Sequence, residues 1–268
     1  MTNDDGIDSI GLHVLARALT ELGDVVIIAP DREFSGSGAA VGALYEFRPE
    51  VRRLKIDGID EAWSLNGPPA LCVLYSKLGV FGDPFDLVVS GINPGSNVGR
   101  SVYYSGTVGA CLAARNGGVS GIAVSQAVTG WGIEGQGWLD IVQNQKWHVA
   151  AEVARVFVAG LIAEPPASPV VANLNVPNLE LAEIAGWEVT EVGAEPPRSM
   201  AIGQLVATDD PDAFGVQLTW GDPVPLPEHT DGGAVERNLV SISYLSRIAA
   251  EVRNDLAKPE AALANLLG

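Results

Sequence analysis

The chain contains few cysteines, histidines and basic residues. Among its 268 residues are 2 Cys and 3 His, and their spacing matches no zinc site. Cys72 and Cys111 lie far apart in apolar stretches, which favours two buried thiols over a disulfide. The 16 Lys and Arg residues are outnumbered by 33 Asp and Glu, for a net charge of -17. Because this charge repels phosphate backbones and anionic lipids, nucleic-acid polymers and membrane surfaces are poor partners.

Long hydrophobic runs are also missing. No uncharged apolar run approaches the ~20 residues that a membrane-spanning helix needs. The first residues lack the pattern of a secretory signal peptide. We therefore expect a cytoplasmic protein. The hydrophobic content of 47% is still enough for a sizeable core, in one large domain or one domain with an extension.

Strand-like and helix-like segments alternate through the first part of the chain. Apolar runs such as 25–29 are typical of strands buried on both faces, and apolar residues at helical spacing lie between such runs. Strands are expected at 25–29, 51–56, 62–65, 86–90, 122–125 and 170–176, helices at 8–22, 70–78, 105–116 and 147–162, and a surface loop at 127–137. This alternation predicts an α/β fold with a doubly wound, mostly parallel sheet.

The sequence changes character after about residue 178. Prolines become frequent, and alternating apolar and polar residues at 214–220 predict β-hairpins. A further strand is expected at 238–245, and one or two closing helices at 246–267. We interpret 1–178 as the core that carries the functional site, and 179–268 as a C-terminal extension with an arm.

Two adjacent carboxylates, Asp4 and Asp5, stand near the start of the chain between Asn3 and Gly6. The glycine lets the backbone turn sharply behind them. In parallel α/β proteins, ligand-binding residues follow the carboxyl end of a buried strand. Too few residues precede Asp4 to form such a strand, so we expect the first strand to be missing or truncated.

Three polar, glycine-rich segments follow predicted strands or stand where a strand should end, at 3–6, 35–38 and 90–99. In a parallel sheet such loops converge on one edge. They supply two carboxylates, a hydroxyl and an amide oxygen, which suit Mg²⁺ or Mn²⁺ better than zinc. Each segment alone has a simpler interpretation as a turn or a flexible loop. Their occurrence together, in this order, favours a metal site.

A fourth segment, Ser105-Gly106-Thr107, opens a predicted helix. Its free amides, two hydroxyls and the helix dipole favour an anion, although Ser105 alone is equally compatible with a simple N-cap. A cation beside a helix N-terminus describes a phosphate site, and the reaction inferred is hydrolysis of a phosphate ester. His13 and His148 are expected to be structural or solvated, and the role of His229 stays open.

These segments resemble four ordered motifs of the SurE family of survival-protein nucleotidases. The motifs are Thr2-Asn3-Asp4-Asp5-Gly6-Ile7, Ala29-Pro30-Asp31-Arg32 with Ser35-Gly36, Ser90-Gly91-Ile92-Asn93 with Gly95, Asn97 and Gly99, and Tyr104-Ser105-Gly106-Thr107-Val108. Thr230-Asp231 and Val240-Ser241-Ile242-Ser243 fit the C-terminal part of the family. The resemblance implies a Rossmann-like core and a metal-dependent phosphatase acting on nucleoside 5′- and 3′-monophosphates.

The resemblance also implies roles for particular residues. By motif position, one divalent ion per subunit, Mg²⁺ or Mn²⁺, is expected on Asp4, Asp5, Ser35 and Asn93. Phosphate and substrate contacts are expected from Asn3, Asn97, Ser105, Gly106 and Thr107. Asp5, or else Asp4, is the expected base or nucleophile, and the choice between these two roles stays open. The C-terminal arm is expected to be exchanged between subunits of a homodimer or homotetramer.

The chain departs from the family pattern at two further places. Gly67-Pro68-Pro69-Ala70-Leu71-Cys72 lacks the hydroxyl and carboxylate of the family's Gly-Thr-Pro and Asp-Cys motif, and Arg100-Ser101 replaces an acidic residue. Both departures can alter the rim of the site and hence the choice of substrate. Two alternatives therefore stay open: a broader phosphomonoesterase or exopolyphosphatase, and a non-catalytic nucleotide-binding protein if the missing first strand disables the site.

Overall fold

The structure is a computed structural model that describes residues 1–42, 48–128, 142–194, 200–221, 224–250 and 252–267. Most of the loop expected at 127–137, and the Pro196-Pro197 pair, lie outside these ranges. The core elements are α1 (Ile10–Leu19), β1 (Val26–Pro30), β2 (Val51–Ile56), β3 (Ile59–Leu65), α2 (Pro69–Lys77), β4 (Leu87–Pro94), η1 (Gly99–Tyr103), α3 (Gly106–Asn116), β5 (Ser120–Gln126), α5 (Trp147–Ala163) and β6 (Val171–Val176). The C-terminal elements are η2 (Leu181–Glu183), β7 (Gly186–Val189), β8 (Met200–Ala207), β9 (Phe214–Trp220), α6 (Asp231–Glu236), β10 (Leu239–Tyr244) and α7 (Ala257–Leu267).

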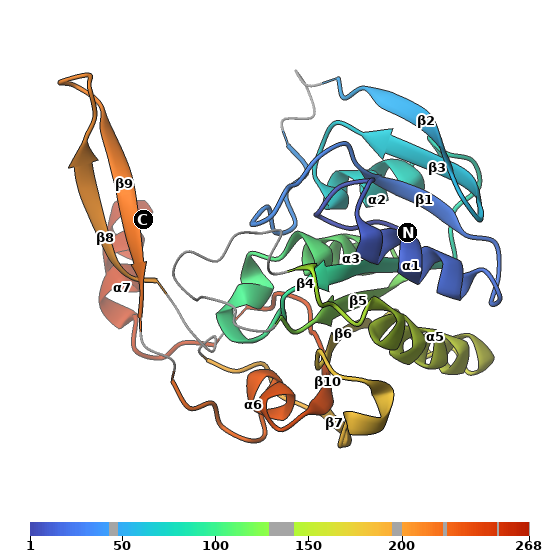
Figure 1. Cartoon of the computed structure of the whole chain (residues 1–268). Helices are drawn as coiled ribbons and strands as arrows, with labels where there is room; N and C mark the ends of the chain where they lie inside the picture. The colour runs from blue at the N-terminus through green and yellow to red at the C-terminus, as the bar shows by residue number, and fades with distance from the viewer. Residues whose placement is uncertain (43–47, 129–141, 195–199, 222–223, 251, 268) are drawn as a thin grey trace.

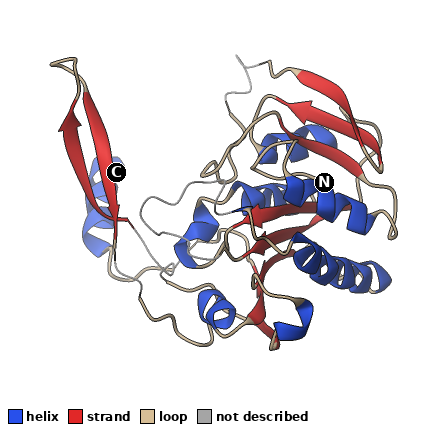
Figure 2. Cartoon of the chain, viewed as in Figure 1, coloured by secondary structure: helices blue, strands red, loops and turns tan. Residues whose placement is uncertain are grey.

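The core strands form two sheets, so the chain has an α/β fold with mixed, mostly parallel sheets (Figure 2). The larger sheet has the order β4-β5-β6-β10-β7, in which only β10 and β6 pair antiparallel. The smaller sheet has the order β1-β3-β2, with β1 parallel to β3. The expectation of one sheet is therefore wrong in the described structure, because only Met1 and Thr2 lie between β1 and β4.

Met1 and Thr2 connect the two sheets through backbone hydrogen bonds. The Met1 nitrogen donates to the Val26 carbonyl at 2.6 Å, and the Met1 carbonyl accepts from the Ile28 amide at 2.8 Å. Thr2 forms an isolated parallel bridge with Ser90. This two-residue bridge stands where the sequence predicts that a full first strand is missing, and it leads directly into Asn3, Asp4 and Asp5.

Helices cover both faces of the larger sheet (Figure 1). α1 and α5 pack together on one face, and α3 packs against β4 and β5 on the other. The main core cluster joins Leu15 and Leu19 of α1 to Ile122, Val124 and Leu174 of the central strands. Because β5 and β6 are buried on both faces, they are apolar along most of their length. Cys72 and Cys111 are buried free thiols, as predicted.

The extension after β7 contains a long hairpin, β8 and β9, which stands apart from the sheets (Figure 1). This confirms the hairpin predicted at 214–220. The closing helical region is shorter than expected, since within the described part of 246–267 only α7 is helical. β7 and α6 are short elements that the sequence analysis does not predict. Among the described residues, no helix is long and apolar enough to cross a membrane.

Two boundaries near the site also differ from expectation. The first helix spans Ile10–Leu19 rather than 8–22, and Thr20 caps its C-terminal end by donating its hydroxyl to the Arg17 carbonyl. β4 continues to Pro94 although a loop was expected from residue 91. It keeps its pairing with β5 across a register shift between Gly91 and Asn93. Asn93 therefore lies at the end of a strand, not in a free loop.

Candidate active site

Asp4 is held at the N-terminus of α3. Its Oδ2 accepts a hydrogen bond from the Gly106 amide at 3.0 Å, and its Oδ1 accepts from the Thr107 hydroxyl at 2.5 Å. The residue is only 3% exposed. Burial raises the pKa of Asp4, and the bonds from Thr107 and Gly106 oppose that rise. The helix N-terminus thus stabilises a carboxylate of the chain itself.

The neighbouring Asp5 carboxylate lacks this support. Both of its oxygens are buried, and neither has a hydrogen-bond partner in the described structure. Burial raises the pKa of Asp5 well above its usual range, and the nearby carboxylates of Asp4 and Glu33 raise it further. A buried carboxylate with two unpartnered oxygens is costly unless it takes up a proton or a cation.

The loop at residues 34–38 packs onto this pair. The Phe34 amide donates to the Asp4 carbonyl at 2.7 Å, and the Gly38 amide donates to the Tyr104 carbonyl at 2.9 Å. A Cβ atom built on Gly106 would lie 2.7 Å from Asp4 Cβ and 2.8 Å from Ser37 Oγ. Gly106 therefore sits between the carboxylate and the loop, where no larger side chain fits.

Within this loop, the structure adds Ser37 to the site. Ser37 Oγ is buried and has no partner among the described residues, whereas the predicted ligand Ser35 is exposed and donates its hydroxyl to Glu33 at 2.8 Å. Ser37 was not among the predicted ligands, although it lies in the same Ser-Gly segment as Ser35. Asn3 Oδ1 and Ser96 Oγ are two further buried oxygens without a described partner.

Asn93 lies at the same edge of the sheet as Asp5. The parallel bridge pairs Thr2 with Ser90, and Asp5 and Asn93 each follow three residues later. The Asn93 side-chain amide donates to the Gly95 carbonyl at 2.7 Å, which leaves its side-chain oxygen as the free end. The structure thus sets the segment that carries Asp4 and Asp5 beside the end of β4, while the loop that contains Ser35 packs against Asp4.

Asn97 is fixed by a buried polar network behind this edge. Its backbone amide donates to Asn175 Oδ1 at 2.7 Å, and its carbonyl accepts from Asn173 Nδ2 at 2.8 Å. Its side-chain amide donates to Ser125 Oγ at 2.8 Å. The side-chain amide of Asn97, a predicted phosphate contact, is therefore already hydrogen-bonded within the protein. In the sequence, Asn173 and Asn175 are polar residues within a strand predicted to be buried, and this pattern could have indicated the network.

The predicted phosphate segment at residues 105–107 is also engaged internally. Ser105 Oγ accepts from the Val108 amide at 3.1 Å, so Ser105 is the N-cap of α3. The Gly106 amide and the Thr107 hydroxyl are bonded to Asp4. Asn3 donates its side-chain amide to the Gly6 carbonyl at 3.0 Å, which stabilises the turn after the carboxylates.

Asp231 anchors the Asn97 loop from the C-terminal extension. Its carboxylate is fully buried and accepts from three backbone amides, those of Gly99, Gly193 and Gly232, at 2.9 to 3.0 Å. Burial raises its pKa, and these three bonds oppose that rise. The sequence analysis noted Thr230-Asp231 without giving it this role. Asp231 connects the candidate site to the segment that leads into the β8–β9 hairpin.

The two departures from the family pattern have plain structural settings. Leu71 is a fully buried core residue of α2, which begins after Pro68. Arg100 lies in η1 and donates its Nε to the Ala194 carbonyl at 2.9 Å, so it links η1 to the extension.

Among the described residues, no three His, Cys, Asp or Glu side chains are grouped as metal ligands. An oxygen site here would have to combine the two aspartates with hydroxyl and amide groups.

The comparisons with known proteins agree with this geometry. The model of the family "Survival protein SurE" matches residues 1–198. The solved structure of the SurE protein from Aquifex aeolicus is similar to the chain at a TM-score of 0.70 and 30% sequence identity, over 98% of each chain. That match extends through the hairpin and the C-terminal elements. The chain therefore belongs to the SurE family.

Proposed function

We propose that the chain is a divalent-metal-dependent phosphatase that hydrolyses nucleoside 5′- and 3′-monophosphates. The observation that carries this proposal is the Asp5 carboxylate, whose two buried oxygens lack a partner in the described structure beside an Asp4 that is already bonded to α3. Family membership supports the same reaction, because SurE proteins are metal-dependent nucleotidases. The proposed product pair is nucleoside and inorganic phosphate.

The residues present fit a hard divalent cation. A carboxylate offers about four lone-pair positions, so Asp4 keeps acceptor capacity beyond its two hydrogen bonds. Asp5, Asn93 and the hydroxyl of Ser35 complete the oxygen set that Mg²⁺ or Mn²⁺ prefers. The unpartnered Ser37 Oγ, Ser96 Oγ and Asn3 Oδ1 are additional polar groups for its water ligands or for the substrate. When bound, the ion would neutralise phosphoryl oxygens and lower the pKa of a water molecule.

The protein's own groups would hold and orient the ester. The Asn97 loop is fixed by Asn173, Asn175 and Asp231, so its position does not depend on the substrate. Burial, together with the carboxylates of Asp4 and Glu33, raises the pKa of Asp5, and a carboxylate with a raised pKa is a stronger base than an ordinary aspartate. A nucleophilic role for Asp5 would use the same unpartnered carboxylate oxygens, and trapping a phosphoaspartate would distinguish it from the role of a base.

Two aromatic rings favour a nucleoside over a simple phosphate ester. Tyr103 is the last residue of η1 and Tyr104 follows it, directly before the phosphate segment; the two residues are 79% and 67% exposed. Exposed aromatic rings stack favourably with nucleic-acid bases, and the gain hardly depends on which base is present. We therefore propose that the leaving nucleoside lies over these rings, with the phosphate toward Asp4 and Asp5.

The hairpin supports the proposal of a homodimer or homotetramer. Its exposed apolar side chains are Ile202, Leu205, Phe214, Val216 and Leu218, each more than half exposed. Because Leu205, Phe214, Val216 and Leu218 lie on the same face, the hairpin has one exposed apolar face, which gains stability by packing against another subunit. Asp231 would thus link the Asn97 loop, near which the substrate is proposed to bind, to the segment that leads into the hairpin, through which the subunits are proposed to assemble.

The test is a phosphate-release assay over a matched panel of esters. Nucleoside 5′- and 3′-monophosphates, p-nitrophenyl phosphate and short polyphosphate are compared with Mg²⁺, with Mn²⁺ and with chelator. We expect activity that needs the metal and that favours nucleotides. Equal rates on all esters would favour the broader phosphomonoesterase, and faster release from polyphosphate would favour an exopolyphosphatase. Absence of release with a folded, metal-loaded protein would favour a non-catalytic nucleotide-binding protein.

A further inference from the structure

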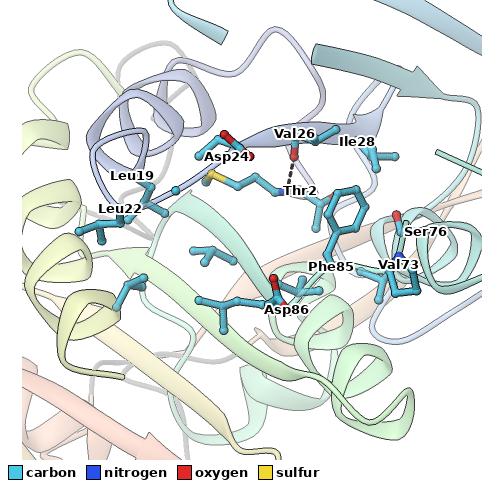
Figure 3. A pocket seen from close by; sticks show the side chains of 18 of the residues that line it. Thr2, Leu19, Leu22, Asp24, Val26, Ile28, Val73, Ser76, Phe85 and Asp86 are labelled. Carbon is cyan, nitrogen blue, oxygen red and sulfur yellow. Dashed lines mark hydrogen bonds between the residues drawn. The ribbon is translucent and has the colours of Figure 1, made fainter. Parts of the chain in front are cut away.

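The apolar pocket between β1 and β4 does not suit a phosphate ester. Its volume is about 480 Å³, and it is lined mainly by apolar side chains such as Val73 and Phe85 (Figure 3). Among its described lining residues, the charged side chains are those of Asp24 and Asp86, which repel an anion. The phosphoryl group of the proposed substrate is therefore expected beside Asp5, and its hydrogen-bond donors have to lie in the loops around that residue.

Most donors that the sequence analysis places at the phosphate are already used within the chain. The side-chain amides of Asn3 and Asn97 and the hydroxyl of Thr107 each donate a hydrogen bond inside the protein. The first turn of α3 is similar, because three of its amides have acceptors within the chain, namely those of Gly106, Val108 and Gly109. A bound phosphoryl group would need a donor that these contacts leave free.

Ser37 supplies such a donor. Its Oγ is buried and has no partner among the described residues. A Cβ atom built on Gly106 would lie 2.8 Å from Ser37 Oγ and 2.8 Å from Asp4 Oδ2, so the hydroxyl is close to the Asp4 carboxylate at the N-terminus of α3. A buried hydroxyl without a partner is unfavourable, and a bound acceptor would remove that cost.

The backbone of the loop fixes the position of this hydroxyl. Gly36 and Gly38, on either side of Ser37, have φ angles of 80° and 54°, which favour glycine. The Ser37 amide donates to the Phe34 carbonyl at 3.1 Å, and the Ser37 carbonyl accepts from the Ala40 amide at 3.1 Å. The hydroxyl is therefore held in place before any substrate binds, as a binding group requires.

The two serines of the loop differ in the chemistry that is open to them. Ser35 donates its proton to Glu33, which leaves the lone pairs of its oxygen for a cation. Ser37 keeps its proton for an acceptor. A phosphoryl oxygen is the acceptor that the proposed reaction brings to this place, and its negative charge strengthens the bond.

We propose that Ser37 contacts the substrate directly, by donating its hydroxyl to a phosphoryl oxygen of the ester beside Asp4. This inference rests on the proposed function, because it assigns one further residue to the same site. The contact is made to the phosphoryl group and not to the leaving group. Ser37 thus contributes to the affinity for phosphate and has little influence on the choice of nucleoside.

The experiment compares the full chain with its Ser37→Ala and Ser168→Ala variants. Ser168 is the matched control, because it is an exposed serine that precedes β6, at the end of the sheet opposite to the site. Isothermal titration measures the affinity for Mg²⁺ alone and then the affinity of the Mg²⁺-saturated chain for inorganic phosphate. Thermal unfolding without either ligand measures stability.

We expect Ser37→Ala to bind phosphate about tenfold or more weakly than the wild-type chain, because a bond to a charged acceptor is lost. Its affinity for Mg²⁺ alone should change less than about threefold, since the hydroxyl is not a ligand of the ion. Its melting midpoint should not fall, because the variant removes a buried hydroxyl that has no partner. Ser168→Ala should match the wild-type chain in all three measurements.

The outcomes separate this inference from the proposed function. Phosphate binding by Ser37→Ala that equals that of the wild-type chain would overturn the inference alone. Equal weakening of Mg²⁺ and phosphate binding would make Ser37 a metal ligand, and a lower melting midpoint would make its role structural; either result would overturn it. A wild-type chain that neither binds phosphate nor releases it from any ester would overturn the proposed function, and this inference with it.

Discussion

At the scale of single residues, Asp5 controls how the metal-free site responds to pH. Its pKa is raised in the folded chain, so the folded state keeps a proton that the unfolded state loses above its ordinary pKa near 4. The metal-free chain therefore becomes less stable as pH rises above that value. Asp5→Asn removes this effect, and we expect it to stabilise the metal-free chain by at least about 1 kcal/mol at pH 8.

Urea unfolding with chelator, at pH 5 and pH 8, measures this difference. Asp8→Asn is the matched control, because Asp8 is an exposed aspartate of the same segment. If Asp5→Asn and Asp8→Asn unfold alike at both pH values, the Asp5 carboxylate is not the uncompensated group that the structure shows.

Because the pKa values of Asp4 and Asp5 are raised, we expect the proposed metal binding to depend on pH. A protonated carboxyl must release its proton before it can bind a cation. We expect Mn²⁺ affinity to increase with pH until Asp4 and Asp5 have lost their protons, and proton release to accompany binding. Calorimetric titrations in two buffers of different ionisation enthalpy count the protons. An affinity that stays constant from pH 5 to pH 8, without proton release, would contradict the assignment of these ligands.

Thr107 is expected to act through Asp4. Thr107→Val keeps the shape of the side chain but removes the hydroxyl that donates to Asp4 Oδ1. Loss of a donor to a buried carboxylate costs about 1–3 kcal/mol, and Thr107→Ser, which keeps the hydroxyl, should recover most of it. Thermal unfolding of the two variants tests this, and equal loss in both would show that packing of the methyl group dominates.

At this scale the sequence predicted the charged groups better than their partners. Adjacent Asp4 and Asp5 before a glycine are visible as a pattern, because their chemistry is local. The partners of Asp4 come from α3, more than 100 positions away, and those of Asn97 come from β5 and β6. Such contacts depend on the packing of strands, so a single sequence does not reveal them.

At the scale of elements, the loop at 34–38 depends on close contact with α3. A Cβ atom on Gly109 would lie 2.0 Å from the Gly38 carbonyl oxygen. Gly109→Ala should therefore push this loop away from α3 and weaken Mn²⁺ binding about tenfold or more, since Ser35 and Ser37 belong to the loop. Isothermal titration of Mn²⁺ measures the effect.

Gly160→Ala provides the control for this prediction. Gly160 is a helical glycine of α5 with nothing within 4 Å of its Cβ position. Alanine there should leave Mn²⁺ affinity unchanged and stabilise the chain by about 0.5–1 kcal/mol through helix propensity. Unchanged affinity in the Gly109→Ala variant would mean that the loop does not contribute to the metal site.

The elements themselves were largely predictable where their periodicity was strong. α5 and the strands at β1, β5 and β6 stand close to their expected positions because long apolar patterns specify them. β7 and α6 were missed, since a four-residue strand beginning at Gly186 and a six-residue helix carry little pattern. β4 was predicted too short because Gly91 resembles a loop residue, although its pairing with β5 continues past it.

At the scale of the whole molecule, we expect the hairpin to determine the proposed assembly. Leu205 and Val216 form a registered pair of exposed apolar residues on β8 and β9. We expect the Leu205→Asp, Val216→Asp double variant to shift the protein from oligomer to monomer, because charges in an apolar interface are not compensated. Light scattering after size-exclusion chromatography measures the mass.

Val156→Asp is the control for assembly, because Val156 is exposed on α5 of the core. It should leave the oligomer intact. A monomeric wild-type chain, or an unchanged mass in the double variant, would contradict assembly through the hairpin.

The sequence pattern did not predict that the core strands form two separate sheets. The alternation of strands and helices predicts mostly parallel pairing, but the order of strands depends on which apolar edges meet in space. Here Thr2 reaches Ser90 as a single bridge, and Met1 donates its nitrogen to the Val26 carbonyl of β1, so these two residues join the two sheets.

The central claim is that Asp5 gives the chain its metal-dependent phosphatase activity. The most direct measurement is phosphate release from a nucleoside 5′-monophosphate with saturating Mn²⁺, by the wild-type chain, Asp5→Asn and Asp8→Asn. We predict that Asp5→Asn loses activity by about a hundredfold or more while remaining folded, and that Asp8→Asn retains it. Full activity of Asp5→Asn, or activity of the wild-type chain that chelator does not abolish, would contradict the account.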